Sequence, residues 1–276
     1  MNIVLTCIGN FQSYILTNIK QLIRLNHKNI YVITNNRFFV NFKNYDVKLI
    51  SAEDLPNSYN YTRRSRLTRS YRNGFYVLCS LRFFVIYEFM KKYNVENVIH
   101  LENDVIVYYN CDILFDIIGN SNKMYIPFDA YIRNIASIVY IPNHSVFKNI
   151  LDRYNFRLND MFNFRNTLVS TNYIDTFPIF IDNNESPEIK FVSRNYKLFN
   201  YIFDAAAMGQ YLGGFDPIYK RKAGFVNTRC VVKYNKYEFI WETSDDIKKP
   251  FLKVNNINIP IFNLHVHCKD LEKFIF

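Results

Sequence analysis

Residues 98–110, VIHLENDVIVYYN, decide the fold because two carboxylates interrupt a run of β-branched apolar residues. The run before Glu102 is almost continuously apolar, as in a central parallel strand that is buried on both faces. Side chains two positions apart on a strand share a face, so Glu102 and Asp104 point the same way, with His100 as a further candidate. Ligands bind at the carboxyl edge of an open parallel sheet, and the two acids lie towards that end of the strand.

Two uncompensated carboxylates at this edge would repel each other and lose hydration. A divalent cation removes both costs, and oxygen ligands suit Mg²⁺ or Mn²⁺, which in turn bridge phosphates. The alternative is a structural pair of acids neutralised by an arginine, for instance Arg82 in the preceding helix. The stretch therefore predicts either a metal site or an ion pair.

A second polar pattern lies near the end of the sequence, in NLHVHCKDL, residues 263–271. His265, His267 and Lys269 alternate, so on an extended segment all three share a face. A histidine can complete a metal site, and a lysine can neutralise phosphate. A His-x-His pattern alone also occurs among ordinary surface histidines, but together with the two acids it favours a metal and phosphate site.

The order of the predicted elements indicates a parallel sheet with crossover helices, as in nucleotide-binding folds. Hydrophobic patterns predict strands at residues 2–9, 29–34, 45–55, 97–104, 123–130, 136–143 and 259–267. They predict helices at residues 11–26, 75–94, 144–156 and 159–168, the last capped by Asn159 or Asp160. Residues 56–74 are predicted to form a loop or an irregular helix. No repeat or linker interrupts the chain, so a single domain is the simplest prediction.

Composition narrows the classes of protein and partner. The chain is 49% hydrophobic, which is enough for a sizeable core, and its net charge of +10 favours an anionic partner. Five arginines lie within residues 61–72, a predicted phosphate-facing loop or solvated basic surface. The five cysteines are far apart and predict free thiols in a reducing compartment. No signal peptide or membrane span is predicted, so we expect a cytoplasmic protein, in the host cytoplasm if it is viral.

The chain resembles a glycosyltransferase of the GT-A fold. HLENDVIVYYN, residues 100–110, resembles the Asp-x-Asp motif of that group in a Glu-Asn-Asp form. It is similar to a set of bacterial and giant-virus glycosyltransferase-like proteins with an HLENDxxxY core. Further similar stretches are SLRFFVIYEFM (80–90), FDAAAMGQYLGGFDP (203–217) and IFNLHVHCKDLEKF (261–274). The match spans roughly residues 76–276, and the first 75 residues match only as a nucleotide-binding α/β half.

The resemblance implies a fold and a reaction. The fold is an α/β, GT-A-like domain over residues 1–276, with a Rossmann-type, mostly parallel central sheet flanked by helices and a smaller acceptor-side part. Residues 1–110 would form the nucleotide-binding half and residues 111–276 the acceptor-binding half. The reaction is sugar transfer from a nucleoside diphosphate sugar to a glycan or protein acceptor, with Mn²⁺ or Mg²⁺ on the diphosphate.

The resemblance also implies roles for the polar residues. Asp104 would bind the metal directly, and Glu102 would support the metal or the ribose because its longer side chain extends further. His267, with His265 as the alternative, would complete the coordination sphere, and Lys269 would contact the leaving diphosphate.

Two further residues belong to the predicted donor site. Asn103 lies between the two acids, and Arg82 either pairs with a carboxylate beside the metal or contacts phosphate. An inverting transferase also needs a base, for which Asp160 and Asp204 are the candidates. Each of these two aspartates has a helix cap as its alternative role. The GGFDP stretch, residues 213–217, predicts a tight turn.

Two other functions remain open from the sequence. A nucleic-acid-binding protein would use the basic segment 61–72, but the acid pair would repel a phosphate backbone, and no known nucleic-acid-binding motif is present. A metal-dependent nucleotidyltransferase also holds Mg²⁺ with two acids on a strand, but the glycine-rich phosphate loop expected near the first strand is missing. The sequence leaves the sugar, the stereochemistry and the oligomeric state open.

Overall fold

A mixed eight-stranded sheet forms the centre of the computed structural model, which describes residues 1–181, 186–215, 221–244 and 246–275. The strand order is β3–β2–β1–β4–β8–β6–β7, and β9 pairs with β6 off this path. These strands are β1 Asn2–Cys7, β2 Ile30–Thr34, β3 Lys48–Ser51, β4 Val98–Leu101, β6 Met124–Ala130, β7 Arg133–Asn134, β8 Ile138–Ile141 and β9 Ile174–Phe177. Only β7 and β8 run against the other six, so the predicted mostly parallel Rossmann-type sheet flanked by helices is confirmed.

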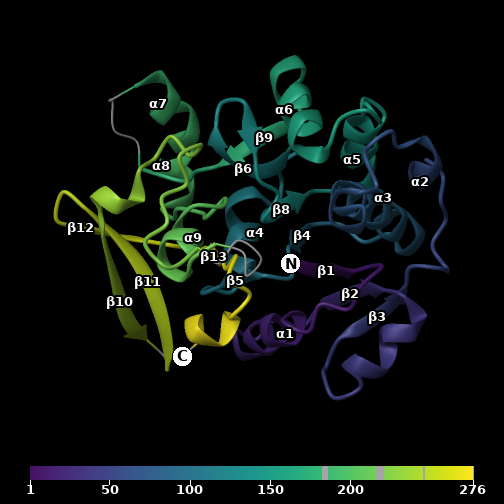
Figure 1. Ribbon diagram of the computed structural model, residues 1–276, viewed down its shortest axis with the longest axis horizontal. Coiled ribbons are helices and arrows are strands. Elements are labelled where there is room, and N and C mark those ends of the chain that lie inside the picture. The colour runs from purple at the N-terminus through teal and green to yellow at the C-terminus, as the bar shows by residue number, and fades with distance from the viewer. Residues whose placement is uncertain (182–185, 216–220, 245, 276) are drawn as a thin grey trace.

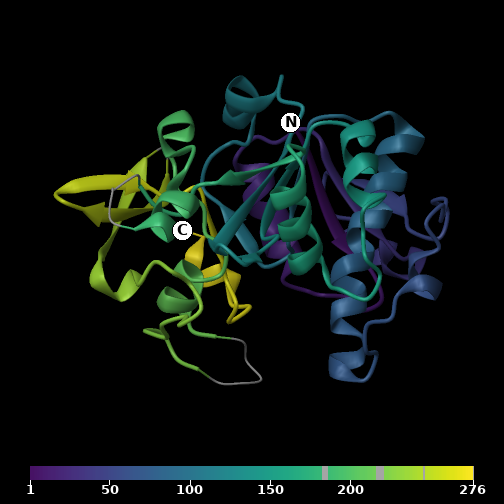
Figure 2. The ribbon, with the colours of Figure 1, turned by 90° about the horizontal axis from the view of Figure 1, so that it is seen from above.

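Helices cover both faces of this sheet because the inner strands are apolar on both faces. The α-helices are α1 Ile15–Arg24, α2 Tyr61–Arg64, α3 Phe75–Tyr93, α4 Asp112–Ile118, α5 His144–Leu151, α6 Asp160–Ser170, α7 Pro187–Ser193, α8 Tyr196–Phe199 and α9 Met208–Gly213, and Figures 1 and 2 show how they surround the sheet. In β1, Val4 shares a core cluster with residues of α3, α5 and α6, whereas Ile3 and Leu5 share another with residues of α1 and α4. Short 3-10 helices are η1 Asn36–Phe42, η2 Tyr71–Asn73, η3 Tyr234–Lys236 and η4 Leu271–Phe274.

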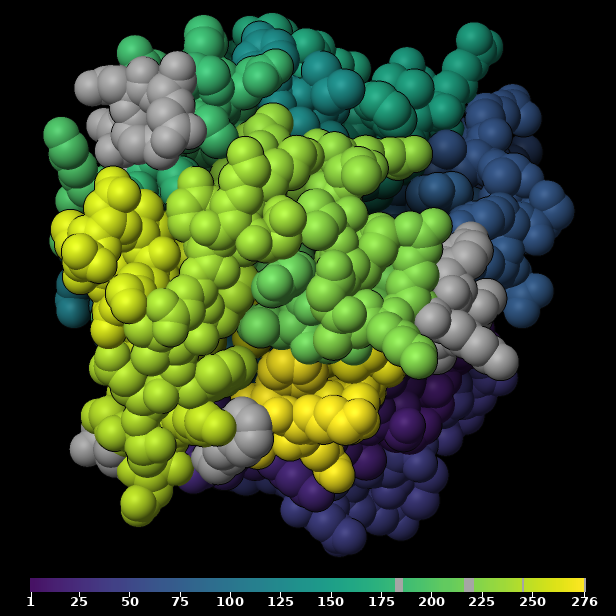
Figure 3. All heavy atoms as spheres, turned by 60° about the vertical axis from the view of Figure 1, so that its left-hand side comes forward, coloured from purple at the N-terminus to yellow at the C-terminus, as the bar shows by residue number. Residues whose placement is uncertain are grey.

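The C-terminal part adds two antiparallel sheets beside the central one. Strands β10 Glu238–Ser244, β11 Ile247–Val254 and β12 Ile257–Pro260 form a three-stranded sheet on the left of Figure 1. Strand β13 Asn263–His265 pairs with β5 Val105–Val107, which follows the acid motif directly. Figure 3 shows the C-terminal segment, in yellow, packed against residues 200–215, in green.

The strand predicted at residues 259–267 is two strands, so that prediction was wrong in its bounds. The chain changes partners after Ile261: the Ile261 amide still donates to Pro250 O of β11 at 3.0 Å, whereas the Phe262 amide donates to Ile202 O at 2.8 Å. Because of this switch, β12 extends the three-stranded sheet while β13 pairs with β5, the strand that follows the acid motif. The change of partner brings the histidine segment next to the two acids.

The structure also tests four smaller predictions from the sequence. Residues 56–74 form the short helices α2 and η2 within irregular chain, as predicted. All five cysteines are free thiols. Over the described ranges, we find no helix that is both long and apolar enough to span a membrane. Asn159 caps α6, since its side chain accepts a hydrogen bond from the Phe162 amide at 3.2 Å.

His27 is expected to make the protein less stable in acid. His27 is buried just past the C-terminal end of α1, and its Nε2 accepts a hydrogen bond from the Cys111 amide at 3.4 Å. Burial lowers the pKa of His27 from 6.5 to about 4. The unfolded state therefore binds more protons below pH 6.5, and stability present above that pH is lost as the pH falls. We expect the free energy of unfolding to fall by about 2 kcal/mol between pH 7 and pH 5 through this group.

Chemical denaturation of His27→Asn at both pH values measures this contribution. The variant should lose that part of the pH dependence. His144→Asn, at a partly exposed position that starts α5, should keep it. Equal pH dependence in both variants would contradict the assignment to His27.

Candidate active site

The acid motif forms the turn that joins β4 to β5. Strand β4 ends at Leu101, the Glu102 amide donates to Ser137 O at 2.9 Å, and the Val105 amide donates back to Glu102 O at 3.0 Å. The acids thus lie just past the carboxyl end of a buried parallel strand. We expected the alternation of side chains along a strand to align the two carboxylates. Both acids lie after the end of β4, so the geometry of the turn aligns them.

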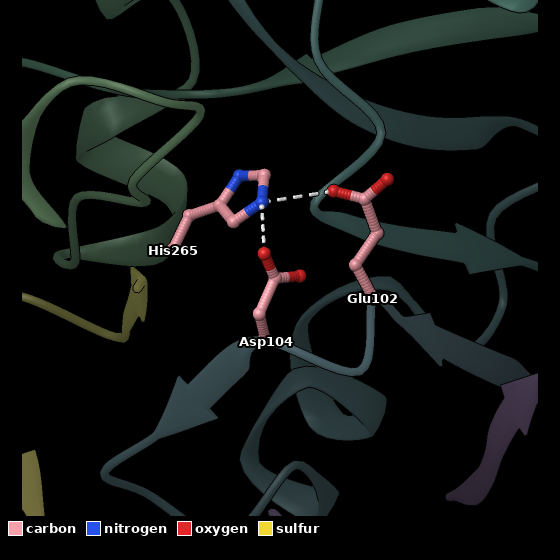
Figure 4. Close-up of side chains that lie close together, drawn as sticks. All are labelled: Glu102, Asp104 and His265. Carbon is pink, nitrogen blue, oxygen red and sulfur yellow. Dashed lines mark ion pairs between the residues drawn. The ribbon is translucent and has the colours of Figure 1, made fainter. Parts of the chain in front are cut away.

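Glu102, Asp104 and His265 converge (Figure 4). His265 Nε2 lies 3.1 Å from Glu102 Oε2 and 3.3 Å from Asp104 Oδ2. One potential ligand atom from each residue lies within 4.8 Å of the others. His100 does not join them, because its Nδ1 contacts Val4 O at 2.9 Å inside the sheet.

Backbone contacts fix the direction of the His265 ring. Pairing of β13 with β5 sets His265 opposite Val105, and the Val266 amide donates to Asp104 O at 2.8 Å. His265 Nδ1 contacts Ala205 O at 2.7 Å, so this nitrogen carries a proton and donates it. The other nitrogen, Nε2, is therefore the one that faces the acids.

Cationic side chains compensate both acids. Arg82 contacts Glu102 closely and lies 3.5 Å from Asp160, while Lys269 contacts Asp104 closely. Lys269 has a left-handed backbone (φ 62°), which is uncommon for a lysine. The arginine pairing that the sequence left open is therefore present, together with the cluster that could hold a metal.

These charges shift the pKa values of the central groups. Burial would raise the pKa of the Asp104 carboxyl, but the positive charges of Lys269 and His265 hold it well below its usual range. Burial would lower the pKa of His265, but the charges of Asp104 and Glu102 raise it to about 9. The imidazolium thus occupies the place between two carboxylates where a metal ion would compete with its proton.

His267 and Asn103 neighbour the three residues of this centre: His267 contacts His265, and Asn103 lies between the two acids in the turn. The rings of His267 and His265 are 4.1 Å apart, and His267 Nε2 is buried with no hydrogen-bond partner among the described residues. Burial, with the charge of His265, lowers the pKa of His267 well below its usual range. Asn103 Nδ2 donates to Thr6 O at 2.8 Å, which ties the acid turn to the end of β1.

The two candidate bases have different surroundings. Asp160 starts α6, lines the cavity described below, and burial raises its pKa although Arg82 opposes this. Asp204 is fully buried, and its carboxylate accepts hydrogen bonds from four backbone amides, those of Ala207, Met208, Gly209 and His265, at 2.7–3.0 Å. These contacts favour the cap role for Asp204, and its role as a base stays a prediction without support.

A cavity of about 770 Å³ opens over the acids. Its lining includes Glu102, Asn103, Asp104, Arg82, Asp160, His265, His267 and Lys269. The loop after β1 also lines it, through Asn10, Gln12 and Tyr14. Our sequence interpretation missed this loop, although the carboxyl end of a first parallel strand is a general place for ligands.

The basic segment, residues 61–72, supplies only a small part of the cavity lining. Of residues 61–72, only Tyr71 and Arg72 line the cavity, and the Arg64 guanidinium lies over the Phe156 ring at 3.8 Å. Gly214 has φ +90°, as a tight turn requires. The last two residues of the predicted GGFDP turn, at positions 216 and 217, lie outside the described residues.

No family model and no curated protein sequence matches the chain. Among solved structures, it is similar to the glycosyltransferase GlyE of Streptococcus pneumoniae, with a TM-score of 0.43, 15% identity and coverage of 63% of this chain and 44% of GlyE. It is similar to an active-site mutant of LgtC, with a TM-score of 0.44, 12% identity and coverage of 70% and 83%. It is also similar to a cytidylyltransferase from Leptospira borgpetersenii, with a TM-score of 0.41, 11% identity and coverage of 68% and 77%. The chain spans less than half of the length of GlyE.

Proposed function

We propose that this protein is a metal-dependent glycosyltransferase, which transfers a sugar from a nucleoside diphosphate sugar to a hydroxyl group of a glycan or protein acceptor. The observation that carries the proposal is the convergence of Glu102, Asp104 and His265 past the end of β4, with Lys269 beside them. The resemblance of HLENDVIVYYN to the Asp-x-Asp motif supports it, as does the similarity to the HLENDxxxY set.

The residues at this centre fit a divalent cation. Two carboxylates and one imidazole suit Mn²⁺, and Mg²⁺ would use mainly the oxygens. His265 is oriented through its other ring nitrogen by the Ala205 carbonyl, an arrangement usual for metal-binding histidines. The buried Nε2 of His267, which has no partner among the described residues, supports it as a further ligand. When bound, the cation would neutralise charge on the diphosphate.

The surrounding side chains have separate tasks in this proposal. Asp104 and Glu102 would hold the cation, and Arg82 keeps Glu102 in place through their ion pair. Asn103 anchors the turn to β1 through the Thr6 carbonyl. Lys269 stabilises the negative charge that builds up on the departing diphosphate as its bond to the sugar breaks.

Asp160 is the base that we propose for an inverting transfer. It accepts the proton of the acceptor hydroxyl while the hydroxyl oxygen bonds to the anomeric carbon. The raised pKa of Asp160, caused by burial, makes its carboxylate a better proton acceptor than an exposed aspartate. Its position in the cavity lining supports this role, whereas Asp204 is absent from that lining.

Thermal unfolding with a panel of nucleoside diphosphate sugars, each with and without Mn²⁺, tests the proposal. A ligand that binds only the folded state raises the melting temperature. We expect one donor to raise it by about 5–10 °C at roughly 100 times its dissociation constant, and only when Mn²⁺ is present. The responding base and sugar would then identify the donor.

Other ligands in the same assay separate the competing functions. A shift with a nucleoside triphosphate and none with any nucleotide sugar would favour a nucleotidyltransferase. A salt-sensitive shift with arbitrary DNA or RNA alone would favour the basic segment as a nucleic-acid site. Either result would overturn the transferase proposal.

A further inference from the structure

One wall of the cavity is a row of planar groups that starts at the candidate metal centre and ends at an arginine. The His267 ring lies 4.1 Å from that of His265 and stacks on Phe215 at 5.5 Å with an interplanar angle of 11°. Phe215 lies 5.4 Å from Phe225, and the Arg221 guanidinium lies over Phe225 at 4.6 Å. All five residues line the cavity, so the row forms a continuous surface of planar groups, with two phenylalanine rings between the histidines and the arginine at its end.

The chain that carries this charged end is anchored to the body of the protein. The Phe215 amide donates to Arg221 O at 2.8 Å, and Asn227 Nδ2 donates to Ala206 O at 2.9 Å. Arg229, two residues after Asn227, also lines the cavity. Arg221 and Arg229 therefore both line the cavity on a chain that is anchored at Arg221 itself and, between the two arginines, through the Asn227 side chain, which also accepts a hydrogen bond from the Arg229 amide at 3.1 Å.

The carboxylates in the described lining of the cavity pair with other cationic side chains and not with Arg221 or Arg229. Each carboxylate in the described lining has a cationic neighbour, as shown above, and Arg133 pairs with Asp129. Within the described ranges, no carboxylate lies at ion-pair distance from Arg221 or Arg229. A nucleoside diphosphate sugar brings about two negative charges, which a divalent cation offsets. The positive charge of Arg221 and Arg229 therefore exceeds what the donor and its metal require.

We propose that the acceptor lies along this aromatic wall and carries an anionic group, a phosphate or a carboxylate, bound by Arg221 and Arg229. This inference rests on the proposed transferase function. Guanidinium groups match the planar oxygens of carboxylates and phosphates through paired hydrogen bonds. The apolar face of a sugar ring can pack on the rings of Phe215 and Phe225, as ligands commonly do on aromatic pocket walls.

Binding to an array of immobilised oligosaccharides tests the proposal. The array carries matched neutral, phosphorylated and carboxylated members, and no donor or metal is added. We expect the wild-type protein to bind acidic members in preference to neutral ones. Arg221→Gln combined with Arg229→Gln should weaken this binding about tenfold or more. Comparison of phosphorylated with carboxylated members identifies the anion.

The control removes the same charge elsewhere. Lys20 and Lys197 are exposed and do not line the cavity, so Lys20→Gln combined with Lys197→Gln should leave binding unchanged. If both double variants lost binding of the acidic oligosaccharides equally, the net charge of the protein would explain the loss, and the proposal would be overturned. Absent binding, or equal binding of neutral and acidic members, would also overturn it.

A third variant distinguishes this subsite from the metal centre. Asp104→Asn should still bind the acidic oligosaccharides, because Arg221 and Arg229 are unchanged. Loss of their binding in Asp104→Asn would place the anion at the metal centre and overturn the subsite. If the array behaves as expected but no nucleotide sugar shifts the melting temperature with Mn²⁺, the transferase function fails while the anion subsite stands.

Discussion

Replacement of Asp104 by asparagine is expected to abolish metal-dependent sugar transfer and to leave the protein folded. The Asp104 side chain is 8% exposed and contacts both Lys269 and His265. Asparagine keeps the shape of this side chain but removes the negative charge that a divalent cation needs. We expect turnover to fall by roughly 10²–10³-fold, the usual cost of removing one group that stabilises charge in a transition state. Release of nucleoside diphosphate, with and without Mn²⁺, measures the effect.

The control for this variant is Asp116→Asn. Asp116 is exposed on α4 and does not line the cavity, so the same chemical change there should leave activity and the Mn²⁺ response unaltered. Melting curves show whether each variant is folded. Full activity of a folded Asp104→Asn protein would show that the metal assignment is wrong.

The N-terminal part of the fold could be predicted from sequence because its signals are local. The strand patterns at residues 2–9 and 29–34 and the long apolar run at 75–94 correspond to β1, β2 and α3. Each element is long enough, or sufficiently β-branched, to show its own periodicity. Parallel order then follows from the crossover helices between strands.

The C-terminal elements lacked such signals. Strands β5 and β13 have three residues each, and their pairing joins segments far apart in the sequence. The alternation of His265 and His267 predicted a shared face, but the chain leaves the strand after His265, and only that ring reaches the acids. Long-range pairing of short strands therefore decided which histidine lies at the centre.

The sequence also could not decide whether Glu102 and Asp104 form a metal site or an ion pair with an arginine. Residue types predicted either a metal site or an arginine pair, and the structure holds an Arg82–Glu102 pair beside the Glu102–Asp104–His265 cluster. An arginine can therefore hold one ligand in place while the other acid faces a histidine and a lysine. Sequence spacing cannot distinguish these arrangements, because the same carboxylate takes part in both.

Asp204 shows most clearly how local sequence left two roles open. Asp-Ala-Ala-Ala is compatible with a helix cap and with a small-residue ligand site. Three of the amide donors to Asp204 belong to residues 207–209, as a cap predicts. The fourth is the His265 amide, which comes from β13 and could not be foreseen from nearby residues. Asp204 therefore joins α9 to the strand that positions His265.

Asp204→Asn is expected to destabilise the protein far more than it slows transfer. An amide can accept at one end only, so some of the four backbone donors would lose their partner in a site with no exposed surface. We expect the free energy of unfolding to fall by at least ~3 kcal/mol, which corresponds to a drop of about 6–12 °C in melting temperature. Asn143→Ala, which removes a cap with a single bond to the Val146 amide, should cost only about 1 kcal/mol.

The turnover of folded Asp204→Asn separates a cap from a base. Loosening of His265 should weaken Mn²⁺ binding, so turnover is compared at saturating Mn²⁺ and below the melting temperature. We expect it to stay within about tenfold of the wild-type value, whereas Asp160→Asn should lose about 10²–10⁴-fold, as removal of a general base does. The reverse result, an unchanged melting temperature with turnover lost only in Asp204→Asn, would make Asp204 the base and return Asp160 to a helix-start residue paired with Arg82.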